Sequence, residues 1–301
     1  MHTLLLAFLS IGQECQQATA RGRDAYERQA YADAASHFAD ARVACADAGQ
    51  TTLDDLVLAH AQALLLAGRP PAAIEAIASL LAYAPTHVAA LKLRARARYL
   101  TGADAEAEAD LRTAAQLAPR DAEIPYDLGR IHAQQGRHRD AYTAFGQALA
   151  LDPRAYRAHD NLGLAAEALG DPDAALRHYL AAIAIVSADP SLAYGTVYAN
   201  LADLLLRRGE HRRAFDAAAE AAARSPREAR HFFLAGKALV HLQQDAIAVK
   251  WLEQSASLDA AYAEPHYLLA QVYRRLGRTT DAARALAAFE RLAALGPRER
   301  R

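Results

Sequence analysis

The segment DLGRIHAQQGRHRDAYTAFGQALALDP, residues 127–153, contains the pattern from which the fold of this chain can be inferred. Its Leu128-Gly129 pair recurs as Leu162-Gly163, 34 residues further along the chain. Landmark residues follow Gly129 at intervals of 12, 16, 19 and 24 positions, and they are Ala141, Phe145, Ala148 and Pro153. A fixed period of this length predicts a repeat protein whose repeats are helical hairpins.

Steps of 34 residues in both directions place eight repeats along nearly the whole chain. The repeats are 15–48, 54–87, 88–121, 122–155, 156–189, 195–228, 229–262 and 263–296, with five-residue insertions at 49–53 and 190–194. The eighth residue of every repeat is Gly or Ala, and the twentieth is always Ala. We expect the two helices of each hairpin to cross closely at these small residues.

The predicted turns between the two helices mostly contain glycine, which permits the left-handed conformation that ends a helix. These glycines are Gly68, Gly102, Gly136, Gly170, Gly209 and Gly277. The first repeat lacks such a glycine, and the seventh has Gln243-Gln244 at its turn. Terminal repeats of an array are expected to be atypical because one face has no neighbour.

The composition agrees with an all-helical chain and excludes some functions. Apolar residues make up 53% of the sequence, and the formal net charge is −1. No basic stripe of the kind found in nucleic-acid-binding proteins is present, so we expect no nucleic-acid partner. Only three of the 34 basic residues are Lys (Lys92, Lys237 and Lys250). This bias fits a GC-rich genome, and we expect a bacterial protein.

With Leu-Gly, Ala, an aromatic residue, Ala and Pro at these spacings, the chain resembles the tetratricopeptide repeat family. The resemblance implies an all-α fold, a right-handed superhelix (α-solenoid) of about eight helix-turn-helix repeats. It also implies a non-catalytic scaffold or adaptor that binds a partner protein or peptide in a concave groove lined by the first helices. The alternatives are a peptide-sensing regulatory protein and an accessory subunit of a transferase or envelope-assembly complex.

The groove positions of the resembling family fall on defined residues of this chain. Lys92, Arg96 and Arg130 would form a basic patch flanked by Tyr126 and Arg157, which suits an acidic or carboxylate-bearing peptide. The alternative is a solvated groove wall. The remaining predicted groove residues are Asn161, Asn200, Phe233, Lys237 and Tyr267.

No catalytic or metal-binding motif stands out in the sequence. A glycine-rich phosphate loop, a paired Cys motif and a His-Glu-x-x-His motif are all absent. The twelve His residues are scattered along the chain. We therefore expect no enzyme activity, no metal and no cofactor.

The amino terminus and the two Cys residues bear on localisation. Residues 1–12 form either a signal peptide or a short apolar helix that packs on the first repeat, and they are too short to span a membrane. Cys15 starts the first repeat and Cys45 lies near its end, so an antiparallel hairpin brings them to one end. We expect an exported, periplasmic protein with a Cys15–Cys45 disulfide. A cytoplasmic protein with two unrelated small residues is the alternative.

Two further departures from the regular repeat are the insertion 190–194 and the missing cap after the last repeat. Ser191 resembles an N-cap, so the insertion 190–194 is expected to lengthen the first helix of the sixth repeat, from about Ser191 to Arg208. The insertion would also divide five N-terminal repeats from three C-terminal ones. The last repeat has no separate capping helix and is followed by the charged tail 297–301, so its last helix exposes one side. Either Arg284, Glu290 and Arg291 keep much of that side polar, or the repeat self-associates through it.

Overall fold

The computed structural model of the chain describes residues 2–189 and 191–294, with side chains from Gly12 onward. This part of the chain is all α-helical and forms two compact halves, Met1–Leu151 and Asp152–Arg301. The N-terminal half contains α1 His2–Glu27, α2 Tyr31–Ala44, α3 Gln50–Leu66, α4 Pro70–Tyr83, α5 Val88–Leu100, α6 Asp104–Leu117, α7 Glu123–Gln134 and α8 His138–Leu151. The C-terminal half contains α9 Tyr156–Ala168, α10 Pro172–Ala188, α11 Thr196–Arg207, α12 His211–Arg224, α13 Ala229–His241, α14 Asp245–Leu258, α15 Ala263–Arg275 and α16 Thr279–Ala294.

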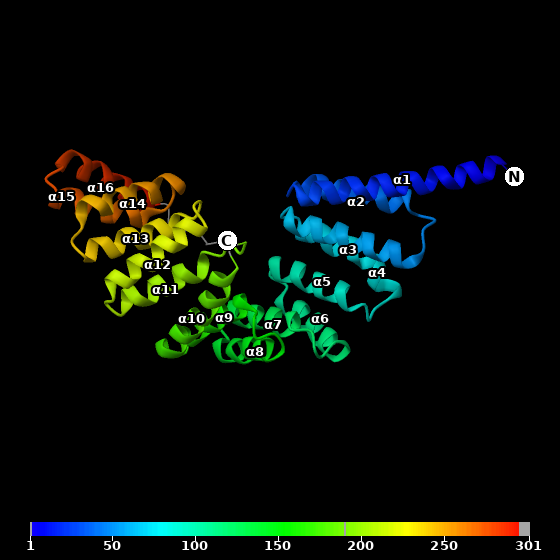
Figure 1. Cartoon of the computed structure of the whole chain (residues 1–301), viewed down its shortest axis with the longest axis horizontal. Coiled ribbons are helices and arrows are strands. Elements are labelled where there is room, and N and C mark those ends of the chain that lie inside the picture. The colour runs from blue at the N-terminus through cyan, green and yellow to red at the C-terminus, as the bar shows by residue number, and fades with distance from the viewer. Residues whose placement is uncertain (1, 190, 295–301) are drawn as a thin grey trace. The chain divides into compact units, whose positions relative to one another are not determined.

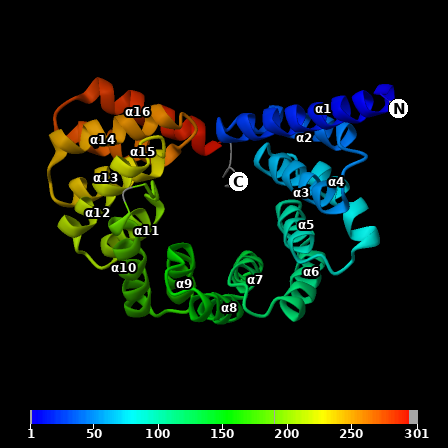
Figure 2. The ribbon, with the colours of Figure 1, turned by 45° about the vertical axis from the view of Figure 1, so that its right-hand side comes forward.

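Within each half, consecutive helices pair into antiparallel hairpins, and each hairpin packs on the next (Figures 1 and 2). The first helices of neighbouring hairpins also touch one another, as α3 and α5 do in the N-terminal half and α11 and α13 in the C-terminal half. The architecture is therefore an all-α solenoid of helical hairpins.

Small residues set the spacing within each hairpin. A Cβ atom on Gly129 would lie 2.6 Å from Cε1 of Phe145, and one on Gly163 would lie 2.5 Å from Cε1 of Tyr179. In these two repeats the eighth position thus faces the aromatic twenty-fourth position of its own repeat. The twentieth-position alanines are all buried: Ala34, Ala73, Ala107, Ala141, Ala175, Ala214, Ala248 and Ala282.

The turns between the paired helices adopt the left-handed conformation. All six predicted turn glycines have positive φ, among them Gly136 at 71° and Gly170 at 81°. In the first and seventh repeats, Gln29 (φ 60°) and Gln243 (φ 58°) occupy this conformation instead. The turn geometry is conserved between repeats even where the glycine that favours it is missing.

The insertion 190–194 does not lengthen the first helix of the sixth repeat, so that prediction was wrong. Helix α11 begins at Thr196 and has 12 residues, while α10 extends to Ala188 and has 17. The backbone amide and hydroxyl of Ser191 donate to the Asp189 carboxylate, at 3.0 and 2.7 Å, so Ser191 closes a turn after α10 instead of capping α11. The two halves divide between Leu151 and Asp152, not at this insertion.

The other insertion, 49–53, joins a helix. Helix α3 begins at Gln50 and has 17 residues, so the second repeat is the one whose first helix is lengthened.

Cys15 on α1 and Cys45 after α2 form a disulfide with a Cα–Cα distance of 4.8 Å, which is the pairing predicted from the antiparallel hairpin.

At the ends of the chain, two predictions concerned the signal peptide 1–12 and the charged tail 297–301. Residues 2–12 lie within α1, and cleavage after them stays a prediction. The tail 297–301 lies outside the described residues. Over the ranges that are described, no helix has the length and apolar character needed to cross a membrane.

Candidate partner-binding site on the first helices

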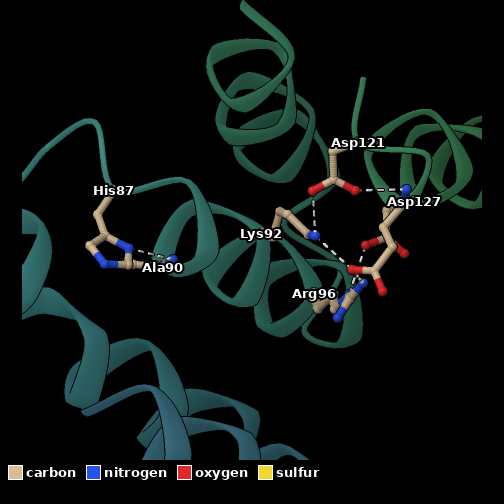
Figure 3. A network of polar contacts seen from close by, with 7 residues as sticks. His87, Ala90, Lys92, Arg96, Asp121 and Asp127 are labelled. Atoms are coloured by element: carbon tan, nitrogen blue, oxygen red, sulfur yellow. Dashed lines mark hydrogen bonds and ion pairs between the residues drawn. The ribbon is translucent and has the colours of Figure 1, made fainter. Parts of the chain in front are cut away.

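The predicted basic residues of the N-terminal half come from two neighbouring first helices. Lys92 and Arg96 lie one turn apart on α5, so both side chains point to the same side, toward the start of α7 (Figure 3). Arg130 lies on α7, with its guanidinium 4.6 Å from the ring centroid of Tyr99. The structure therefore brings the three predicted cations to one face.

These cations meet carboxylates at the end of the third repeat and at the start of the fourth. Lys92 Nζ lies 2.6 Å from both Asp121 Oδ2 and Glu123 Oε2. Arg96 Nε lies 2.7 Å from Asp127 Oδ2, and its Nη2 lies 3.0 Å from Glu123 Oε2.

Arg130 Nη1 is 3.6 Å from the second oxygen of Asp127. Three positive side chains therefore face three negative ones, and the formal charge of the cluster is zero. The prediction of a basic patch was wrong, because its cations are neutralised within the protein.

Burial and hydrogen bonding shift the pKa values of this network in opposite directions. Asp127 is only 5% exposed, and burial raises its pKa against the opposing effect of Arg96. The hydrogen bond from Lys92 lowers the pKa of Glu123. Burial lowers the pKa of Lys92, but its bonds to Asp121 and Glu123 outweigh this and raise it overall. Buried charge pairs add little net stability, because desolvation offsets their attraction, but removal of one partner is costly.

The C-terminal half carries a different polar cluster on its first helices. Asp160 of α9 is 2% exposed and accepts hydrogen bonds from Tyr194 Oη at 2.6 Å and from Asn200 Nδ2 at 2.9 Å. Arg230 of α13 donates to Asn200 Oδ1 at 3.1 Å. Burial raises the pKa of Asp160, although both hydrogen bonds oppose the shift.

Sequence reasoning assigned Asn200 to the groove but missed the roles of Asp160, Tyr194 and Arg230. Tyr194 belongs to the insertion 190–194, and its ring also packs against Tyr156 with centroids 5.0 Å apart. The signal in the sequence that could have indicated this cluster was Tyr194, a tyrosine within an insertion, together with Asp160 on a first helix. Among residues 2–189 and 191–294, no cationic side chain lies within ion-pair distance of Asp160.

The other predicted groove residues occupy varied environments in the C-terminal half. Arg157 is exposed, with its guanidinium 5.6 Å from the Tyr156 ring, and its carbonyl accepts a hydrogen bond of 2.9 Å from Asn161. Phe233 packs against Tyr262 and Lys237 is half-buried. Tyr267 is 46% exposed. In the N-terminal half, Tyr126 packs against Phe145 with ring centroids 5.8 Å apart.

Comparison with protein families identifies what these hairpins are. A sequence model described as tetratricopeptide repeat matches residues 58–122 and 126–190. Both segments lie within the array of hairpins, and the matched period is the one seen in the structure. Residues 58–122 and 126–190 of the chain are therefore similar to tetratricopeptide repeats.

Solved structures share the fold at low sequence identity. A tetratricopeptide repeat protein from the bacterium Parabacteroides merdae aligns with a TM-score of 0.60 and 18% identity, covering 82% of this chain and 94% of that chain. A chain of the APC/C hetero-tetramer Cut9-Hcn1 aligns with a TM-score of 0.66 and 16% identity, covering 90% of this chain and 51% of that one. YrrB, described as a repeat protein with an unusual peptide-binding site, has a TM-score of 0.50 and 16% identity, covering 65% and 98%. Comparison with curated proteins gave no match.

Proposed function

We propose that the chain is a non-catalytic scaffold or adaptor that binds a partner protein or peptide along the first helices of its repeats. The observation that carries this proposal is the kind of surface these helices offer. Leu164 on α9 and Tyr267 on α15 are large apolar residues of first helices, and they are 44% and 46% exposed. Between such apolar contacts, polar clusters hold neighbouring first helices in a fixed register. Apolar anchors beside fixed polar groups are typical of protein interfaces.

The charges of the first helices bear on the partner's chemistry. Because Lys92, Arg96 and Arg130 are neutralised by carboxylates, the surface does not favour a strongly acidic peptide. Glu123 and Arg130 remain partly accessible at the edge of the cluster, with side chains 60% and 34% exposed. The partner segment is therefore one of mixed charge with apolar anchors. The peptide-binding site named for YrrB, which shares the fold, is compatible with this proposal.

A photo-cross-linking experiment tests which helices contact the partner. Benzoylphenylalanine is placed at Leu164 or Tyr267 on first helices, or at Leu180 on the second helix α10 as a matched control, since Leu180 is 45% exposed. After irradiation in the native host, adducts are identified by mass spectrometry. We expect one partner to be captured from positions 164 and 267 and not from 180. Capture from 180 alone, or equal capture from all three positions, would refute the proposed face.

We further propose that the protein works in an oxidising compartment, because disulfides persist there and are rare in reducing ones. The proposal is tested on protein isolated from its native host under acid quench, with a maleimide that adds mass to free thiols. No mass shift before reduction and two additions after it are expected. Two additions before reduction would contradict the assignment.

A further inference from the structure

A pocket of about 540 Å³ lies in the N-terminal half, away from the polar cluster on α5 and α7. It is formed by two second helices, α2 and α4, with α3 between them. The buried side chains of Val57 and Leu80 lie at its base. Val43 and Tyr83 stand at its sides and are 78% and 54% exposed. Pockets of this size and apolar character hold ligand groups in other proteins.

The pocket depends on a departure from the regular repeat. Gln50 and Leu53 line it, and both belong to the insertion 49–53 that forms the first turn of α3. A repeat of regular length would lack these two lining residues. The pocket is thus a property of this chain's insertion, not of the repeat itself.

Arg42 contributes to the pocket a positive charge that no ion pair of the described residues holds. Its guanidinium forms no ion pair with any carboxylate in the described part of the chain, and its Nη1 lies 3.4 Å from His60 Nδ1. Burial, with added repulsion from Arg42 and Arg69, lowers the pKa of His60, which keeps the imidazole neutral and able to accept this bond. Arg42 is half-buried, so a charge that is partly withdrawn from water lacks a carboxylate partner.

The acidic residue that lines the pocket does not fill this need. Asp54 accepts hydrogen bonds from Gln50, at 2.9 Å, and from the Tyr83 hydroxyl. These bonds hold the wall formed by α3 and α4 together. The pocket therefore combines an apolar base, a fixed wall and one guanidinium that is available to a ligand.

We propose that this pocket binds a large apolar side chain of a partner protein, with a neighbouring carboxylate of the same segment paired to Arg42. A Phe, Leu or Trp side chain matches the apolar base, and a carboxylate is the geometric complement of a guanidinium. The site lies on the second helices α2 and α4 and on the N-terminal turns of α3. It therefore adds a contact beyond the first-helix face, and it shares with the proposed function only the premise that the ligand is a protein segment.

Peptide selection on the full chain tests the proposal. A random dodecapeptide phage library is panned against the chain, and the enriched clones are then measured as synthetic peptides against Arg42→Gln and Val43→Asp. Both residues are at least partly exposed, so both variants should fold, which circular dichroism verifies. Arg139→Gln is the matched control, since Arg139 is an exposed arginine on the second helix α8.

Peptides with Phe, Leu or Trp within about three positions of Asp or Glu are expected, because an extended segment of that length spans roughly 10 Å. Their Kd should rise about tenfold in Arg42→Gln and in Val43→Asp and stay unchanged in Arg139→Gln. Replacement of the acidic residue of the peptide by its amide should weaken binding to the native chain equally.

Three outcomes would overturn the proposal. Peptides that bind Arg42→Gln and Val43→Asp as well as the native chain do not use the pocket; if Glu123→Lys abolishes their binding, they support the first-helix site alone. Peptides that need no carboxylate contradict the role of Arg42. If no peptide is enriched while dodecanoate shifts the methyl resonances of Val43 and Leu53, the occupant is a fatty acid and not a protein segment.

Discussion

The two halves of the chain fix their first helices by different means. In the N-terminal half, Lys92 of α5 forms an ion pair with Asp121, just before α7, and Arg96 of α5 forms one with Asp127 within α7. In the C-terminal half, the buried carboxylate of Asp160 is held by a hydroxyl and an amide, and the nearest cation, Arg230, reaches it only through Asn200. One fold therefore accommodates both a charge-compensated and a hydrogen-bonded polar cluster, and the two should respond differently to mutation and to pH.

The largest difference is expected when a cation is removed from each cluster. Arg96→Met leaves Asp127 buried with only the more distant Arg130, and we expect a loss of about 3 kcal/mol in the free energy of unfolding. Arg230→Met removes a hydrogen bond to the Asn200 amide and a partly exposed ion pair of 3.9 Å with Asp203, and it should cost about 1 kcal/mol. Urea denaturation followed by circular dichroism measures both, with the exposed Arg139→Met as a control. Equal losses in the two variants would mean that the clusters do not differ as described.

Removal of one hydroxyl from the C-terminal cluster should have an intermediate effect. Tyr194→Phe takes away the 2.6 Å hydrogen bond to Asp160 and leaves a buried carboxylate with one donor fewer. We expect a loss of about 1.5 kcal/mol. Tyr267→Phe is the control, because the Tyr267 hydroxyl has no hydrogen bond in the described structure. A loss below about 0.5 kcal/mol would show that Tyr194 is not needed to satisfy Asp160.

The pH dependence of stability should have opposite signs for Asp160 and Glu123, one carboxylate from each cluster. The pKa of Asp160 is raised in the folded state, so its ionisation costs stability as the pH rises above 3.8, the ordinary value of Asp. The pKa of Glu123 is lowered, so its ionisation adds stability that is lost as the pH falls below 4.5. Between pH 4 and 7, Asp160→Asn should therefore gain stability relative to the native chain, and Glu123→Gln should lose it. Urea titrations at several pH values test this, and differences of the same sign would contradict the assigned shifts.

The repeat itself could be predicted from the sequence because small and aromatic residues recur at fixed spacings in each period of 34 residues. Gly129 and Phe145 lie 16 positions apart, and the structure shows why, since a side chain at residue 129 would collide with the ring. The Cys15–Cys45 pair followed from the same hairpin geometry. Such constraints act within one repeat, where sequence distance fixes spatial distance.

The charge of the site could not be predicted so simply, because it depends on residues at the end of the same repeat and at the start of the next one. Lys92 and Arg96 were identified by their groove positions, but Asp121, Glu123 and Asp127 lie 27 to 31 residues further on. A search for cations alone therefore misses the carboxylates that neutralise them. A search across adjacent repeats at the second, sixth and last positions would have found them.

The two insertions show another limit. Both have five residues, yet 49–53 joins α3 while 190–194 becomes a turn. Tertiary contacts explain the second case. A Cβ atom added at Gly195 would lie only 2.5 Å from the Ala221 carbonyl oxygen, and the Tyr194 hydroxyl donates a hydrogen bond to Asp160. Local capping signals such as Ser191 do not reveal these long-range contacts.

The smallest predicted effect compares the two turns that lack glycine, one in each half. Gln29 and Gln243 both adopt a left-handed conformation that costs a residue with a Cβ about 1 kcal/mol. Gln243→Gly should remove this strain, but glycine also gains freedom in the unfolded chain, so we expect a net stabilisation of about 0.5 kcal/mol. Gln29→Gly should behave in the same way, whereas Gly136→Gln, at the equivalent turn of another repeat, should destabilise the protein. Thermal unfolding of the three variants tests this, and a lower melting temperature for both glycine variants would mean that the Gln side chains stabilise their turns by contacts that outweigh the backbone strain.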